Sequence, residues 1–169
     1  MKRSFLIPTL LSILLVNLTA QELSQPNGLT VNFIASVENV YLNGYPVITA
    51  LSDAITQKEN YQFADICSQN PFFGWILPAN QRNRLQESYQ ILVSSNRDAL
   101  LNDKGDIWDS GKVISNESTN VLYKGKALEP QKVYYWKVKF WDNHGYESAF
   151  SKVGQFKTGN SLKSYSTDR

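Results

Sequence analysis

Side chains that could carry out catalysis or bind a metal are scarce in this sequence. His144 is the single histidine and Cys67 the single cysteine among 169 residues. A histidine pair, a cysteine and histidine metal cluster and an internal disulfide are therefore excluded within the chain. An HExxH motif, a GxSxG elbow and a phosphate-binding loop are also absent. We expect no catalytic residue, no cofactor and no metal, and we interpret Cys67 as a small buried hydrophobic residue rather than a reactive thiol.

Four acidic residues lie close together in the sequence, at Asp98, Asp103, Asp106 and Asp109. Carboxylates at such short spacing are potential calcium ligands. Their order, however, lacks the glycine and the terminal glutamate of the twelve-residue calcium loop. We therefore interpret this segment as a solvated loop.

Aromatic residues offer a different chemistry, because a ring can cover a sugar or pack in a protein interface. The run from Val133 to Asp142 has an alternating pattern. Side chains alternate across a β-strand, so one set faces the core and the other faces outward. The inward set is Tyr134, Trp136, Val138 and Phe140, and the outward set is Tyr135, Lys137, Lys139 and Trp141. Tyr135 and Trp141 are therefore predicted on an outer face.

Phe72 and Ile76 are placed in the same way, opposite Phe73, Trp75 and Leu77. A strand that faces water should alternate cleanly with polar residues, so these outer groups require cover. Residues 29–47, a catalytic domain or a glycan could supply it. Trp75 and Trp136 are predicted to face each other in the core. For Trp108 we favour packing under a neighbouring loop, with a sugar platform as the alternative. Five residues are thus candidates for interface or sugar contact: Phe72, Ile76, Tyr135, Trp141 and Trp108.

Short strands must position these groups. Two are expected within residues 29–47, joined by a bend, and from residue 61 onward about seven more. Their expected ranges are 63–67, 72–77, 86–95, 107–113, 119–123, 133–141 and 155–158. Residues 49–60 form either a helical turn or an exposed loop, and one further turn is expected at 99–101. This number and spacing of strands is typical of an all-β immunoglobulin-like or fibronectin type III sandwich.

The segment before Tyr134 supports this fold. Leu128 and Pro130 precede the tyrosine in the spacing of a tyrosine corner. In such a corner the hydroxyl bonds to backbone a few residues upstream. We therefore predict that Tyr134 closes one end of the core and bonds to backbone near residues 128–130.

The two ends of the chain differ in composition from the rest. Residues 1–20 have a basic start, an apolar stretch and a terminal Ala20, which is typical of a secretory signal peptide and too short for a membrane anchor. Its removal would leave 17 − 2 = 15 basic against 15 acidic residues. A neutral chain predicts neither nucleic-acid nor anionic-lipid binding. Residues 159–169 are interpreted as a linker or the truncated start of another domain, which suggests a fragment or a lost downstream domain.

The segment 72–158 resembles the N-terminal fibronectin-like module of bacterial α-L-rhamnosidases. Five motifs occur in the same order, and they cover roughly half of the chain. They are Phe73-Gly74-Trp75-Ile76, the strand 86–95, Asp106-Ile107-Trp108-Asp109-Ser110-Gly111, Tyr134-Tyr135-Trp136-Lys137-Val138, and Trp141-Asp142-Asn143-His144-Gly145 with the following 148–151. Phe150 departs from the pattern, because relatives often have tryptophan there.

The resemblance implies that catalysis takes place in a downstream (α/α)₆ barrel through two carboxylates, and no part of that barrel is recognised here. Residues 21–60 are expected as a strand-rich segment and 61–158 as the sandwich. We predict a non-catalytic accessory module of a secreted or periplasmic bacterial rhamnosidase-like glycoside hydrolase, which packs on or orients its catalytic domain. The alternative is a free-standing carbohydrate-binding or cell-surface adhesion domain, with a rhamnose-containing glycan as partner.

Overall fold

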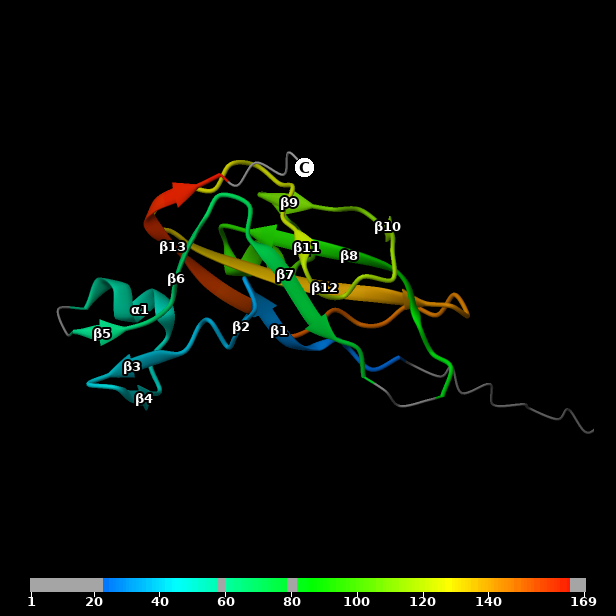
Figure 1. Ribbon diagram of the computed structural model, residues 1–169, viewed down its shortest axis with the longest axis horizontal. Coiled ribbons are helices and arrows are strands. Elements are labelled where there is room, and N and C mark those ends of the chain that lie inside the picture. Colours follow the sequence, from blue (N-terminus) through cyan, green and yellow to red (C-terminus); the bar gives the residue numbers. More distant parts are fainter. Residues whose placement is uncertain (1–22, 58–59, 79–81, 165–169) are drawn as a thin grey trace, which may run out of the picture.

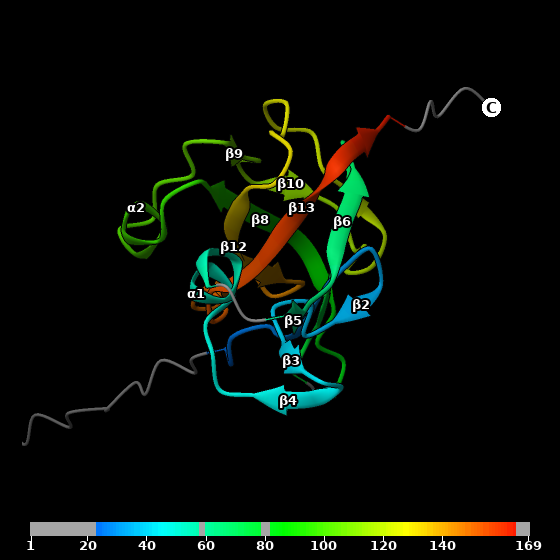
Figure 2. The same ribbon diagram turned by 90° about the vertical axis from the view of Figure 1, so that its left-hand side faces the viewer.

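The computed structural model describes residues 23–57, 60–78 and 82–164. The predicted signal peptide, residues 1–20, lies outside the described residues. The chain forms a sandwich of two packed, mainly antiparallel sheets, with a small third sheet and two short helices beside it (Figure 1 and Figure 2). This arrangement confirms the predicted all-β, immunoglobulin-like sandwich.

The smaller sheet of the sandwich has the strand order β11-β7-β1-β2. Its strands are β1 (Asn27–Val31), β2 (Ile34–Ala35), β7 (Phe72–Ile76) and β11 (Val121–Leu122). The larger sheet has the order β10-β8-β12-β13-β6, and β9 also pairs with β8. Its strands are β6 (Asp65–Ser68), β8 (Gln86–Ser94), β9 (Trp108–Asp109), β10 (Val113–Ile114), β12 (Val133–Asp142) and β13 (Gly154–Lys163).

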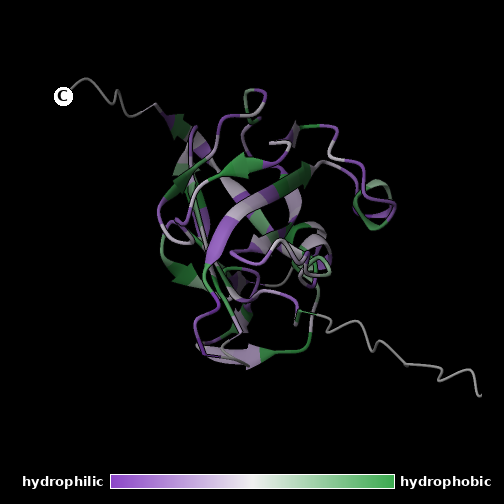
Figure 3. Cartoon of the chain, turned by 90° about the vertical axis from the view of Figure 1, so that its right-hand side faces the viewer, coloured by the Kyte–Doolittle hydropathy of each residue, from purple (hydrophilic) through white to green (hydrophobic). Residues whose placement is uncertain are grey.

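The core lies between the sheets and is built from alternate residues of β12 and β7. Tyr134, Trp136 and Val138 are buried, as the alternation predicts. Trp136 meets the small sheet at Phe73, with 4.4 Å between the ring centroids. Trp75 is buried in the same core, where its ring contacts Tyr89 at 5.2 Å between centroids. The predicted core position of both tryptophans is therefore confirmed, and the ring that faces Trp136 is that of Phe73. Figure 3 shows hydrophobic and hydrophilic residues mixed along the strands, as expected when each strand has an inner and an outer face.

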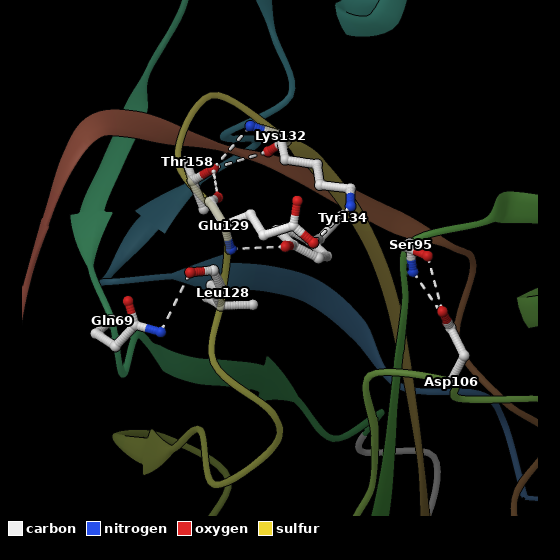
Figure 4. A network of polar contacts seen from close by, with 8 residues as sticks. All are labelled: Gln69, Ser95, Asp106, Leu128, Glu129, Lys132, Tyr134 and Thr158. Atoms are coloured by element: carbon white, nitrogen blue, oxygen red, sulfur yellow. Dashed lines mark hydrogen bonds and ion pairs between the residues drawn. The ribbon is translucent and has the colours of Figure 1, made fainter.

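The tyrosine corner is present as predicted. The Tyr134 hydroxyl accepts a hydrogen bond of 2.9 Å from the backbone N–H of Glu129. The Thr158 hydroxyl donates to the Glu129 carbonyl at 2.7 Å, and the Lys132 N–H donates to the Thr158 hydroxyl at 2.9 Å. Figure 4 shows this network, in which Gln69 also donates to the Leu128 carbonyl at 3.3 Å. The loop before β12 is therefore fixed to β13 and to the loop after β6.

The expected N-terminal segment, residues 21–60, is divided between two places. Strands β1 and β2 belong to the sandwich itself, because β1 pairs with β7. The remainder forms a separate three-stranded sheet of β3 (Val40–Leu42), β4 (Tyr45–Val47) and β5 (Tyr61–Gln62), beside the helix α1 (Leu51–Thr56). Figure 1 shows this unit at one end of the sandwich. The helical alternative for residues 49–60 is correct.

Two further details differ from or extend the predictions. Strand β13 continues past residue 158 to Lys163, because its second half pairs in parallel with β6 (Figure 2). The start of the expected linker is therefore part of the sheet. The turn expected at 99–101 is the helix α2 (Arg97–Leu101), and the Asn96 side chain caps it by accepting from the N–H groups of Asp98 and Ala99.

Cys67 is exposed, so its interpretation as a buried residue was wrong. Strand β6 alternates strictly, with Ile66 and Ser68 facing inward. Cys67 therefore lies on the outer face of β6, because successive side chains of a strand point to opposite faces of the sheet.

The corner bond makes a direct prediction. Tyr134→Phe removes the acceptor of the Glu129 N–H while keeping the ring, so the free energy of unfolding should fall by about 1 kcal/mol. Tyr135→Phe is the matched control, since Tyr135 is half-buried on the opposite face of the same strand. Urea unfolding of both variants measures the difference. Equal midpoints for Tyr134→Phe and the wild type would contradict a stabilising corner.

Candidate interaction surfaces

The outer face of the large sheet carries a row of alternating amines and rings, which we call the cation–aromatic ladder. Its members are Lys112, Trp141, Lys139, Phe150 and Lys137. The Nζ atoms of Lys112 and Lys139 lie 4.4 and 5.0 Å from the centre of the Trp141 ring. Those of Lys139 and Lys137 lie 4.7 and 4.5 Å from the centre of Phe150. Each ring thus contacts two cations, which is favourable for the negative ring faces.

Two carboxylates neutralise part of the ladder. Glu147 accepts from Lys139 at 2.6 Å and from the indole N–H of Trp141 at 3.1 Å. Lys137 pairs with Asp103 and is only 5% exposed. The hydrogen bond from Lys139 holds the pKa of Glu147 below its usual value. The outer face is therefore closed by the chain itself.

A tight turn after β12 positions Glu147 and Phe150 over the sheet. Asp142 is fully buried and pairs with Arg84. Its carboxylate also accepts from the N–H groups of His144 and Tyr146 at 3.0 and 2.9 Å. Burial alone would raise the pKa of Asp142, but Arg84 and these N–H groups lower it overall. Charge-assisted hydrogen bonds to Asp142 thus stabilise the turn. Because of this turn, the following loop runs back over the outer face of β12.

The predicted outer residues do not form one surface. Trp141 and Tyr135 lie on the large sheet, whereas Phe72 and Ile76 lie on the small sheet. The cover of Trp141 comes from Lys112, Lys139 and Glu147, not from residues 29–47. Sequence reasoning missed Phe150 and Glu147 as partners, although the lysines that alternate with Trp141 were a visible signal of a mixed cationic and aromatic face.

The outer side of the small sheet has an exposed apolar face, made up of Phe33, Phe72, Leu122 and Ile76. Phe33 stacks on Phe72 with 6.1 Å between centroids, and Leu122 pairs with Phe72 across β11. Phe33 is 69% exposed and Ile76 is 59% exposed. Ile76 packs so closely over Gly28 that a Cβ there would lie 2.5 Å from its side chain. Residues 28–33 therefore cover Phe72 and Ile76 only in part.

Phe33 is exposed because of the turn that contains it. The two residues between β1 and β2, Asn32 and Phe33, both have positive φ, at 49° and 65°. This is the pattern of a type I′ hairpin turn, which favours asparagine and glycine. Asn32 exchanges hydrogen bonds with Phe72: its N–H donates to the Phe72 carbonyl at 2.8 Å, and its side-chain oxygen accepts from the Phe72 N–H at 2.9 Å. Phe33 does not share the buried face of Val31, because strand β1 ends at Val31 and Phe33 lies in the turn that follows.

Trp108 packs against the core, as favoured from the sequence. Its ring lies against Phe73 and Tyr123, at centroid distances of 6.3 and 5.2 Å. The neighbouring acidic residues have structural partners. Asp106 accepts from the backbone and hydroxyl of Ser95 (Figure 4), and Asp109 accepts from Gln90. Within the described ranges, no three His, Cys, Asp or Glu side chains are grouped to hold a metal ion.

The sandwich topology and the tyrosine corner together define an immunoglobulin-like module, and one of its sheets has an exposed apolar outer face. The family model for the Rha78A-like N-terminal immunoglobulin domain matches residues 56–161. The match covers more than half of the chain, which therefore belongs to this family. In the part of the chain that the structure describes, neither helix is long and apolar enough to cross a membrane.

Similar proteins are α-L-rhamnosidases. One from Formosa agariphila is 44% identical over 92 residues, which are 54% of this chain and 10% of that protein. The structure of α-L-rhamnosidase from Dictyoglumus thermophilum has a TM-score of 0.55 at 45% identity, over 56% of this chain and 11% of the other. The structure of α-L-rhamnosidase from Streptomyces avermitilis, complexed with L-rhamnose, has a TM-score of 0.59 at 26% identity. The match covers 80% of this chain and 10% of the other. The chain thus spans about a tenth of the length of these relatives.

The lowered pKa of Glu147 predicts a pH-dependent contribution from the ladder. Glu147→Gln should reduce the free energy of unfolding by about 0.5 kcal/mol at pH 7, the scale of an exposed ion pair. A depressed carboxyl pKa contributes stability above the unfolded value of about 4.3, and this is lost as the pH falls through the folded pKa.

The difference between wild type and Glu147→Gln should therefore begin to shrink near the unfolded pKa of about 4.3 and disappear once the pH lies below the folded pKa of Glu147. Glu87→Gln, another exposed carboxylate, is the control and should show no such difference. Urea midpoints at pH 7 and pH 3 test this, and a difference of equal size at both values would exclude the ion pair as its source.

Proposed function

We propose that this chain is a non-catalytic accessory module of an α-L-rhamnosidase-like glycoside hydrolase, and that its small-sheet apolar face packs on the catalytic domain. Membership of the N-terminal immunoglobulin domain family supports this, together with relatives of whose length this chain matches only about a tenth. The exposed apolar face is the observation that carries the proposal. The larger outer face is already covered by its ladder, so the small sheet is the face left to a partner.

The conformation of Phe33 strengthens the choice of face. A bulky residue with positive φ is strained, and such strain concentrates at functional sites. Here the strained residue is also the most exposed ring of the face, at 69%. Folding alone would favour asparagine or glycine at this position of a type I′ turn. A partner that covers the ring explains why phenylalanine stands there.

We propose a secreted or periplasmic location in a bacterium. The basic and apolar pattern of residues 1–20 supports export. The bacterial organisms of the relatives support a bacterial source for this chain. We also propose a role in carbohydrate metabolism, which rests on the activity named for the relatives. The chain would support the hydrolysis of rhamnosides by a catalytic domain and would not perform it.

The purified chain should not release rhamnose from an aryl rhamnoside. Inverting hydrolysis requires two carboxyl groups about 6.5–9.5 Å apart across one sugar. Several described acidic residues instead serve as structural partners, as Asp106 and Asp142 do. A colorimetric assay with a full-length α-L-rhamnosidase as positive control tests this. Activity that is abolished by mutating a carboxylate of this chain would overturn the non-catalytic proposal.

Phe33→Asn separates stability from partner binding. Asparagine tolerates positive φ, so the variant should be as stable as the wild type or more stable, by up to about 1 kcal/mol. Loss of the ring should weaken binding to a rhamnosidase whose own N-terminal domain has been removed, by roughly tenfold for an interface ring. Surface plasmon resonance and urea unfolding measure the two effects.

Tyr45→Ser is the matched control, because Tyr45 is equally exposed but lies on β4, outside the apolar face. It should leave binding unchanged. Circular dichroism establishes that the truncated enzyme is folded before binding is measured. Unchanged binding by both Phe33→Asn and Ile76→Thr, in the presence of measurable wild-type binding, would place the interface elsewhere.

A further inference from the structure

The side of the sandwich has an open cleft between the edges of its two sheets. Strands β9 and β10 border it on the large sheet, and β11 borders it on the small sheet. The cavity has a volume of about 310 Å³. Its lining includes Trp108, Tyr89, Glu117, Asn120 and Lys124. This volume is at the lower end of the range of ligand sites, which is about 300–1,000 Å³, so the cleft suits a small molecule rather than a polymer chain.

Trp108 forms a fixed aromatic wall of the cleft. Phe73 and Tyr123 hold its ring from the core side, at 6.3 and 5.2 Å between centroids. Gly125 allows this placement, because a Cβ there would lie 2.6 Å from the Trp108 Cβ. The ring is only half-buried and its free part borders the cavity. A rigid, partly exposed indole offers a large contact area at a low cost in side-chain entropy.

Polar groups around this wall are free to bond to a ligand. The side chains of Glu117, Asn120 and Lys124 form no hydrogen bond or ion pair within the described part of the chain, and neither does the Tyr89 hydroxyl. Tyr89 is 7% exposed. Burial, and then the Glu117 carboxylate, raise the pKa of its hydroxyl, so that it stays a protonated donor beside that carboxylate. The cleft thus combines an amide, an amine, a phenol and a carboxylate.

The charges indicate which ligands fit. Glu117 and Lys124 offset one another, so the cleft favours neither an anion nor a cation. Acceptors and donors are both present, which suits hydroxyl groups that donate and accept at once. A pyranose ring adds an apolar C–H face that can lie on the indole.

We propose that this cleft binds one uncharged pyranose unit, with its C–H face on Trp108 and its hydroxyls on Tyr89, Glu117, Asn120 and Lys124. This goes beyond the proposed docking function, because the cleft opens on the side of the sandwich, shares only Leu122 with the small-sheet apolar face and needs no catalytic domain. A single sugar makes few contacts, so the dissociation constant should be in the millimolar range, about 1–10 mM.

The four tryptophans provide an internal control for the test. In an NMR titration of the ¹⁵N-labelled full chain with L-rhamnose and, separately, D-glucose, the indole N–H of Trp108 should shift and saturate. Those of Trp75 and Trp136 should not move, because both lie in the core. The Trp141 indole is bonded to Glu147 in the ladder and should also stay in place.

Surface variants then test the polar partners without disturbing the core. Glu117→Gln should weaken binding at least fivefold, and so should Asn120→Gly, which keeps the positive φ of 58° at that position. Glu87→Gln is the matched control and should leave binding unchanged. The proposal is overturned if neither sugar saturates the Trp108 signal by about 100 mM, well above the expected range. It is also overturned if Trp141 shifts instead, or if Glu117→Gln and Glu87→Gln bind equally.

Discussion

Strand β12 is the constraint on which the rest of the structure depends, because it is hydrogen bonded along both edges and covered on both faces. Its edges pair with β8 and β13. Its inner face supplies Tyr134, Trp136 and Val138 to the core, and its outer face supplies Lys137, Lys139 and Trp141 to the ladder. A one-residue slip of register would exchange these faces, burying two lysines in the core. The core on one face and the ladder on the other therefore fix the register of β12 together. The registers of β8 and β13 are set by their pairing with β12.

The cover of the outer face is made of long cationic side chains rather than apolar ones. Lysine stems lie over the rings while their amines bond to carboxylates, as Lys139 does with Glu147 at 2.6 Å. Such a layer shields Trp141 and Phe150 from water without leaving an apolar patch. Among the described residues, the small sheet has no equivalent layer, since its outer positions include Gly28, Thr30 and Gly74. The difference between the sheets, rather than the mere presence of aromatic residues, is what distinguishes a closed face from a docking face.

The features that could be predicted from the sequence are those set by neighbours along the chain. The alternation of β12 and the spacing from Leu128 to Tyr134 are local patterns, and both led to correct predictions. Features set by distant partners could not be read in this way. Phe33 fits the period of β1, yet the turn at Asn32 is fixed by Phe72, forty residues later. Cys67 faces outward because β6 pairs with the distant β13 in the register that turns Ile66 and Ser68 inward. Glu147, which accepts from the Trp141 indole, lies in a loop whose path depends on the buried Asp142.

The position of β11 connects the two proposed surfaces. Leu122 pairs with Phe72 in the small-sheet apolar face, and it also lines the side cleft with Asn120 and Lys124. A partner domain seated on the apolar face would therefore border the cleft and could extend its wall. If both proposals hold, a bound sugar and the catalytic domain contact the same short edge strand from two sides. Any coupling between these two sites would be reciprocal, so that each ligand would alter the affinity of the other by the same factor. The short strand of two residues is thus the element at which sugar recognition and domain docking would be linked.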